Sequence, residues 1–302
     1  MKRYLPLALS VIFLGCQQET KEKETIREGK MTIAMDESLT KVMTEQIRAY
    51  QIRYPKADIR VRVEPEQKAI QLMLSDSVDA VAVTRELTPE EQTYFSSRNK
   101  RYEPAIMALE GVVLVTSNEN PLNQISIEEL KSAFSPSGKY QLWFDQSNSS
   151  NLNFVKEKLK LGDLSNLPVY GAKGTLDLIE QIKDNPKAIG FIGFNWISEE
   201  GSTQQEILKK VKIVGLSSKT GEEPLVPSTK TLKSRKYPFE RLVYLHTTDN
   251  RWGVPMGFIR FSCAQVGQII TEKMGLIPYY IIPKEIVVNR KPLNPETKKE
   301  TK

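Results

Sequence analysis

The sequence predicts an α/β fold, in which helices cover both faces of a largely parallel sheet. Two observations support this prediction. Buried-strand patterns alternate with amphipathic-helix patterns along most of the chain, and this order is typical of parallel strands joined by helical crossovers. Helix-start signals also follow the strands, as in the capping box of Thr88 and Glu91, where Pro89 takes its favoured first helical position.

The first part of the chain contains three strand patterns with helix patterns between them. Apolar residues recur at helical spacing from Leu39 to Tyr50, behind Ser38 as a predicted N-cap. A shorter helix is predicted from Pro65 to Leu74. The strands are predicted at 31–35, 59–63 and 78–83.

The pattern restarts after an apolar stretch at 105–116 and a turn at Asn120-Pro121. A second capping box, formed by Ser126 and Glu129, opens the next helix. Further strands are predicted at 140–144, 188–194, 211–216 and 241–246, and helices at 152–159, 174–185 and 256–274.

The N-terminus has the features of a bacterial secretory signal. A basic start is followed by an apolar run that closes on Gly15-Cys16, and this run is too short to span a bilayer as a mature helix. A small residue directly before a cysteine resembles the bacterial lipobox, which implies a lipid on the Cys16 sulfur. We expect a signal peptide at 1–15, a lipidated polar tether at 16–28 and a disordered tail at 289–302.

The composition excludes several classes of function. The net charge is +6, and removal of the signal leaves 41 basic against 37 acidic residues, a mild excess that does not predict nucleic-acid binding. The sequence has one histidine, His246, and no G-x-S-x-G, H-E-x-x-H, C-x-x-C or glycine-rich phosphate motif. Cys263 lies in an apolar stretch that is typical of a small buried hydrophobe. We therefore predict neither an enzyme nor a cofactor or metal site.

Three polar stretches follow predicted strands and open helices. They lie at 36–39, 84–87 and 147–151. Because the carboxyl ends of strands in an open α/β sheet face the ligand crevice, these stretches can converge on one point. The third stretch, "SNSSN", has two interpretations on its own residues. It is either a capped surface loop or an anion cradle at a helix N-terminus.

Five longer stretches match one known family in their order and spacing. They include "SVDAVAVTRELTPEE" at 77–91 and "AIGFIGFNWIS" at 188–198. The others lie at 33–55, 110–121 and 237–278, so that the match covers roughly 29–283. On these residues the chain resembles the PstS-like phosphate-binding receptors of ABC transporters, which are type II periplasmic binding proteins.

The resemblance implies a two-lobed fold. Each lobe would be a mostly parallel sheet flanked by helices, and a two-stranded hinge near 105–116 and 210–216 would join them. The first lobe would be discontinuous, formed by 29–110 and 214–288, and the second would be formed by 111–213. Ligand would close between the lobes.

The resemblance also implies ligand residues in three loops. The family presents a hydroxyl at the start of its first helix, a Ser/Thr-Arg-x-Leu loop after its third strand, and a central Arg-x-x-x-Ser-Gly-Thr loop. The matching residues are Ser38, Thr84, Arg85, Ser149, Ser150 and Asn151. The chain departs from the family in that Phe144 or Asp145 replaces the arginine and a serine replaces the glycine. A further loop of the family, rich in Gly and Ser, is here "EPEQKAI" at 64–70, without a hydroxyl.

The function that the resemblance implies is capture of a solute outside the cytoplasm. The protein would be a monomeric lipoprotein, held on the membrane through Cys16, that binds phosphate or a similar small oxyanion and delivers it to an ABC-transporter permease. The departures leave an alternative open: an interaction or sensor lipoprotein that keeps the fold but has an eroded ligand site.

Overall fold

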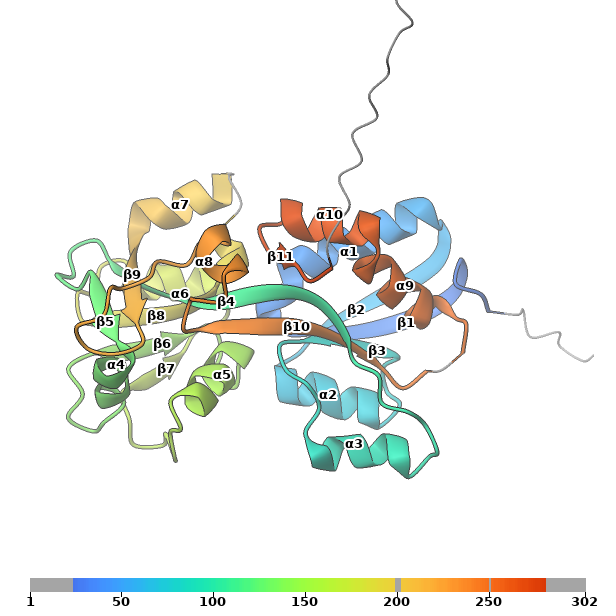
Figure 1. Ribbon diagram of the computed structural model, residues 1–302, viewed down its shortest axis with the longest axis horizontal. Coiled ribbons are helices and arrows are strands. Elements are labelled where there is room, and N and C mark those ends of the chain that lie inside the picture. Colours follow the sequence, from blue (N-terminus) through green and yellow to red (C-terminus); the bar gives the residue numbers. More distant parts are fainter. Residues whose placement is uncertain (1–23, 199–201, 250, 281–302) are drawn as a thin grey trace, which may run out of the picture.

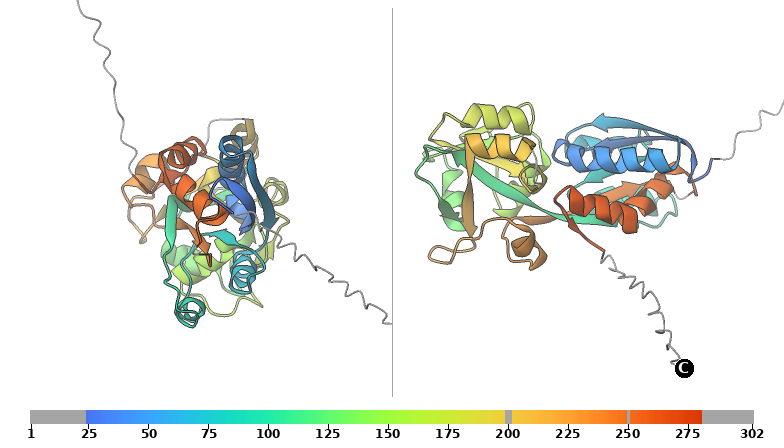
Figure 2. Two further views of the ribbon diagram at one scale, coloured as in Figure 1. Left: turned by 90° about the vertical axis from the view of Figure 1, so that its right-hand side faces the viewer. Right: turned by 90° about the horizontal axis from the view of Figure 1, so that it is seen from above.

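The computed structural model describes residues 24–198, 202–249 and 251–280. They form two lobes that lie side by side, each a sheet flanked by helices (Figure 1). The strands follow the order β2-β1-β3-β10-β4-β8-β6-β7. Two of them, β4 (Ala105–Ser117) and β10 (Glu240–Thr247), run between the lobes in both Figure 1 and Figure 2.

The first lobe is built around three parallel strands. β1 (Glu28–Met35) lies between β2 (Lys56–Val63) and β3 (Ala80–Val83) and is parallel to both. One apolar cluster lies on the side of α1 and α9, and a second lies on the side of α2 and α3. The helices of this lobe are α1 (Thr40–Arg53), α2 (Glu66–Leu74), α3 (Pro89–Ser96), α9 (Val254–Cys263) and α10 (Gln265–Lys273).

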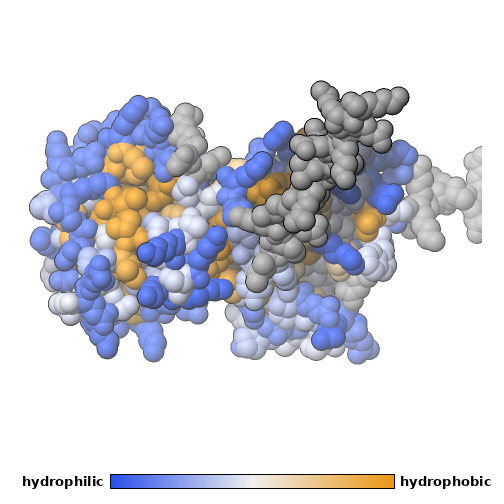
Figure 3. Space-filling view, turned by 45° about the horizontal axis from the view of Figure 1, so that its top comes forward, coloured by the Kyte–Doolittle hydropathy of each residue, from blue (hydrophilic) through white to orange (hydrophobic). Residues whose placement is uncertain are grey.

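The second lobe is built on the far half of β4. β8 (Ala188–Gly193) is antiparallel to β4 and parallel to β6 (Gln141–Phe144), which is parallel to β7 (Val169–Gly171). β9 (Val211–Ser217) pairs with the end of β4 and with β5 (Gln124–Ser126). On the face shown in Figure 3, apolar surface gathers on this lobe among hydrophilic residues. The helices are α4 (Ile127–Ala133), α5 (Ser150–Lys158), α6 (Thr175–Ile182) and α7 (Ser202–Lys210), and α8 (Thr229–Lys233) follows β9.

The strand β4 passes from one lobe to the other, as predicted for the stretch 105–116. Its first half pairs with β10 and with β11 (Ile277–Pro278) in the first lobe, and Val112–Ser117 pairs with β8 and β9 in the second. The predicted second crossing near 210–216 is wrong, because β9 stays in the second lobe with β4 and β5 as partners. The strand that runs along β4 into the first lobe is β10, which pairs with both β4 and β3.

The start of the first helix differs from the prediction. Ser38 does not cap α1 but lies inside a short 3-10 turn, η1 (Glu37–Leu39). Asp36 caps this turn, since its carboxylate accepts the Ser38 N–H. The turn frees the Ser38 hydroxyl from capping, and that hydroxyl points into the molecule.

The long helix predicted at 256–274 is two helices. The chain is extended at Ala264, with φ −88° and ψ 175°, so that α9 ends there and α10 begins. A Cβ at Gly267 would stand 2.5 Å from the Cα of Ser262. Only glycine therefore allows the first turn of α10 to pack this closely on the end of α9.

The two ends of the chain lie outside the described residues. The predicted signal peptide, Cys16 and the C-terminal tail belong to 1–23 and 281–302, of which the structure describes nothing. Among the helices of 24–198, 202–249 and 251–280, none has the length and apolar character needed to cross a membrane.

Candidate functional site

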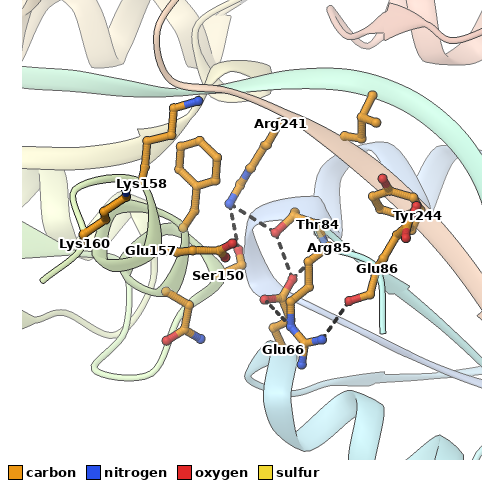
Figure 4. A pocket seen from close by; sticks show the side chains of 13 residues that line it. Glu66, Thr84, Arg85, Glu86, Ser150, Glu157, Lys158, Lys160, Arg241 and Tyr244 are labelled. Carbon is orange, nitrogen blue, oxygen red and sulfur yellow. Dashed lines mark hydrogen bonds and ion pairs between the residues drawn. The ribbon is translucent and has the colours of Figure 1, made fainter. Parts of the chain in front are cut away.

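A cavity of about 580 Å³ lies between the lobes. The first lobe contributes Glu66 and Thr84, the second lobe contributes Ser150 and Phe154, and Arg241 enters from β10 (Figure 4). Its volume lies within the range of roughly 300–1,000 Å³ that is usual for small-molecule sites. The cavity is therefore the candidate site.

Arg241 is the centre of the site. Its Nε and one terminal nitrogen lie 3.1 and 3.0 Å from a carboxylate oxygen of Glu110, and both side chains are almost fully buried. The guanidinium also lies 3.2 to 3.3 Å from the hydroxyls of Thr84, Ser150 and Ser38. One buried cation thus reaches hydroxyls from both lobes.

Asp36 joins two of these hydroxyls across the lobes. Its Oδ1 accepts hydrogen bonds from the Ser38 hydroxyl at 2.7 Å and from the Ser150 hydroxyl at 2.6 Å. The Ser150 N–H, at the start of α5, donates to Asp36 Oδ2 at 3.3 Å. The Asp36 carboxylate therefore lies at the N-terminus of α5, where the helix favours a negative charge.

Glu66 accepts a hydrogen bond from the third of these hydroxyls, that of Thr84. Its Oε1 accepts the Thr84 N–H at 2.7 Å and the Thr84 hydroxyl at 2.8 Å. The neighbouring Arg85 makes a bidentate pair with Glu91, at 2.8 and 2.9 Å, and bonds Gln67 at 2.9 Å. Arg85 lines the cavity, but its donors are engaged within the first lobe.

A second set of bonds fastens η1 to the second lobe. The Thr175 N–H, at the start of α6, donates to Glu37 Oε1 at 3.2 Å. Asn195 donates its side-chain amide to the Ser38 carbonyl at 2.9 Å. Two adjacent acids of the first lobe, Asp36 and Glu37, therefore sit on the N-termini of two helices of the second lobe.

Comparison with known proteins decides the family. A model described as the PBP superfamily domain matches residues 19–265. The chain belongs to the PBP superfamily. This confirms the resemblance to the periplasmic binding proteins, and the two lobes of this superfamily member are the arrangement that the resemblance implied.

Curated relatives of this PBP-superfamily chain are phosphate-binding proteins by name. It is 24% identical over 205 residues to the phosphate-binding protein PstS of Staphylococcus saprophyticus, a match that covers 62% of this chain and 60% of the relative. It is 29% identical over 132 residues to PstS 2 of Streptococcus pneumoniae, which covers 43% and 42%. The chain thus spans less than two thirds of the length of these relatives.

Solved structures share the fold. A substrate-binding protein from Clostridium perfringens, solved with bound phosphate, superposes with a TM-score of 0.67 at 16% identity and covers 83% of this chain and 100% of its own. An ABC-type phosphate transport receptor from Vibrio cholerae has a TM-score of 0.64 at 17% identity, with 82% and 99% covered. The predicted α/β fold of type II periplasmic binding proteins is thereby confirmed.

The site of this superfamily member is rich in buried acids. Burial raises the pKa of Glu66 and of Glu110, and Asp36 adds to the rise at both. Burial, Asp36 and Glu37 hold the pKa of Asp145 well above its usual range, and Asp145 lies near Ser149 without a hydrogen-bond partner of good geometry among the described residues. Arg241 is the one arginine or lysine among the buried residues that the structure describes. Within that same part of the chain, no group of His, Cys, Asp and Glu is arranged to hold a metal.

The structure brings three of the six predicted ligand residues together. Ser38, Thr84 and Ser150 meet around Arg241. Ser149 instead caps α5, since its hydroxyl accepts the Leu152 N–H. Asn151 is buried beside the site, and its side chain has no hydrogen-bond partner among the described residues. Arg85 is paired with Glu91.

The sequence-based reasoning missed the charged residues of the site. Glu110 interrupts a run of apolar residues in β4, and Arg241 directly precedes Leu242 and Val243 in β10. A charge at such a position is almost never fully buried unless it is paired. That anomaly is the signal that could have identified them. Glu66 gave a weaker signal, because an acid in the first turn of a helix is common.

Proposed function

We propose that this protein captures a small oxyanion, with phosphate as the leading candidate, in the cleft between its lobes and delivers it to an ABC importer. The observation that carries the proposal is the convergence of hydroxyls from both lobes on Arg241. Hydroxyls and a guanidinium are the groups that recognise phosphate oxygens. The names of the relatives and the phosphate bound in a structural neighbour support the same ligand.

The buried acids favour phosphate over sulfate. Hydrogen phosphate has an O–H group that can donate a hydrogen bond to a carboxylate, whereas sulfate has no such donor near neutral pH. Asp36 is a buried acceptor that bonds Ser150 at the edge of the cavity, where it adds to the charge of the buried acids. An oxyanion without a proton would face them with unfavourable charge and no compensating hydrogen bond.

The proposal includes an anchored, extracytoplasmic location. A lipid on Cys16 would hold the protein on the membrane, and the cleft would face the space outside the cytoplasm. A monomer suffices for this role, since the cavity is formed within one chain. The permease of an ABC transporter is the proposed partner.

A second candidate function rests on the same site. The hydroxyls of Ser38 and Ser150 donate to Asp36, and that of Thr84 donates to Glu66. Donors already engaged by the protein's own carboxylates favour a two-lobed interaction or sensor protein that takes no solute. The two candidates differ in one measurable property, which is ligand binding.

Thermal unfolding with and without ligand tests the proposal. A ligand at one hundred times its Kd stabilises the folded state by about 2.7 kcal/mol, and each kcal/mol raises Tm by about 2–4 °C in a protein of similar size. Phosphate should therefore raise Tm by several degrees, and sulfate should raise it less. A Tm that phosphate, sulfate and other small oxyanions leave unchanged would favour the second candidate.

A pair of serine variants locates the binding site. Ser150→Ala removes a hydroxyl at Arg241 and should reduce the phosphate-dependent shift. Ser165→Ala is the matched control, because Ser165 is exposed and its hydroxyl donates a hydrogen bond to the nearby Asp163 of the same loop. Equal shifts in both variants would place phosphate binding elsewhere.

A further inference from the structure

Glu66 occupies the place of an anion. It is the first residue of α2, and its side chain is 2% exposed. Its Oε1 accepts both donors of Thr84, the N–H at 2.7 Å and the hydroxyl at 2.8 Å. A carboxylate presents two oxygens much as an oxyanion presents two of its own. The Thr84 donors are therefore occupied from within the protein.

This arrangement comes from a segment that departs from the family pattern. The stretch "EPEQKAI" offers no hydroxyl, and Pro65 at the N-cap of α2 makes no side-chain capping bond. The structure places a carboxylate at this position instead. An acceptor thus stands where the resemblance implied a loop of hydroxyl donors.

Two arginines lie near Glu66, and each is paired with an acid. Asp36 faces it from the loop after β1, and Arg241 faces it from β10. Arg85, which follows β3, has its Nε 3.7 Å from Glu66 Oε2, while Glu91 of α3 neutralises this arginine. Glu110 of β4 in turn neutralises Arg241. Lys158 and Lys160 of the second lobe also line the cavity, as do Glu86 and Glu157. Among the described residues, an added anion would therefore find no unpaired arginine beside Glu66, and the other cations of the cavity are its two lysines.

We propose, on the basis of the oxyanion function above, that Glu66 is a built-in competitor that sets the affinity of the site and couples anion binding to proton uptake. The anion takes the N–H and hydroxyl of Thr84, and the displaced carboxylate of Glu66 gains a proton from solvent. Glu66 is a specificity-determining residue in this scheme. If Glu66 stays ionised, its charge lowers the affinity for any anion that binds beside it.

The electrostatics agree with the geometry. Burial and the charge of Asp36 raise the pKa of Glu66, whereas the two bonds from Thr84 and the charge of Arg241 lower it. Loss of the Thr84 bonds to an incoming anion removes two interactions that hold Glu66 ionised. Proton uptake on binding follows from this change.

Calorimetry of phosphate binding to wild type and Glu66→Gln tests the proposal. The glutamine side chain would keep an oxygen acceptor for Thr84 but lose the charge, so the variant should bind phosphate at least tenfold more tightly. Titrations at pH 6, 7 and 8, each in two buffers of different ionisation enthalpy, give the number of protons taken up. The wild type should take up more protons than the variant, and subtraction cancels the titration of phosphate itself.

Two further variants complete the experiment. Glu64→Gln is the matched control, since Glu64 lies two residues away in an exposed pair with Arg62, and it should behave as wild type. Glu66→Ala replaces Glu66→Gln if the latter does not fold. Tighter binding by a Glu66 variant supports the proposal, even if the wild type binds no phosphate and the proposed function fails. Equal affinity and equal proton uptake in wild type and variants overturn it while the proposed function stands, and absence of binding in every protein overturns both.

Discussion

Replacement of Arg241 by methionine should strongly destabilise the protein. Arg241 and Glu110 form a buried pair with distances of 3.0 and 3.1 Å, and their side chains are 2% and 0% exposed. Loss of one partner leaves a buried charge uncompensated, which typically costs about 3–5 kcal/mol. Met fills a similar volume, so the cost reflects charge and hydrogen bonding more than a cavity.

The expected size can be measured by thermal unfolding. At about 2–4 °C per kcal/mol, a loss of about 3–5 kcal/mol lowers Tm by about 6–20 °C. The deficit should also depend on pH. Burial already raises the pKa of Glu110, and Arg241 opposes this rise. Without Arg241 the carboxyl will be protonated more readily, so the deficit should be smaller at pH 5 than at pH 8.

Two controls separate the buried pair from general effects. Adding Glu110→Gln to Arg241→Met removes the orphan charge and should recover part of the lost stability. Arg251→Met removes an exposed arginine that pairs with Asp249, and it should change stability by less than about 0.5 kcal/mol. A loss of under about 1 kcal/mol in Arg241→Met, equal at pH 5 and pH 8, would refute the reasoning.

Three other predictions concern pH, closure and the anchor. Burial lowers the pKa of His246 to about 4, so the folded state excludes a proton that the unfolded chain binds below about pH 6.5. Stability should therefore decrease as the pH is lowered from about 6.5 to about 4. Thermal melts across this range should show that His246→Gln loses this part of the pH dependence. Asp36→Ala combined with Glu37→Ala removes the hydrogen bonds that join these two acids to the N-termini of α5 and α6, and it should increase the radius of gyration in small-angle scattering. An unchanged scattering curve would show that these bonds do not hold the lobes together. Cys16→Ser should release the protein from membranes in cell fractionation, and full membrane retention would contradict lipid anchoring.

The local order of the chain was predictable because its signals are local. The capping boxes at Thr88 and Ser126 form as the sequence predicts, each with its glutamate three residues later. Ser38, Thr84 and Ser150 follow β1, β3 and β6, and the carboxyl ends of these strands face the cleft. Strand-end position alone was therefore enough to bring the three hydroxyls together.

The central charges were not predictable because they depend on long-range pairing. Arg241 meets Glu110 across 131 positions of sequence, through the antiparallel register of β10 on β4 that sets Arg241 opposite Glu110. Apolar periodicity does not distinguish β9 from β10 as the strand that returns to the first lobe. The same ambiguity misplaced the second hinge strand and hid the arginine that this strand carries.

Arg241 supplies the buried cation that the central loop lacks. Asp145 stands at or beside the place of the family's arginine in that loop, and its raised pKa favours the neutral carboxyl, so the second lobe supplies hydroxyls but no buried cation among its described residues. The cation comes from β10, which lies between the lobes and pairs with β4. From there one guanidinium reaches Thr84 and Ser38 on one side and Ser150 on the other. Since it is fixed to Glu110 in the hinge strands, its place does not depend on closure. Under the proposed function, closure would bring together hydroxyls, the Asp36 carboxylate and the cavity-lining Lys158 and Lys160, so an anion would have to compete with acids that the lobes themselves bring together.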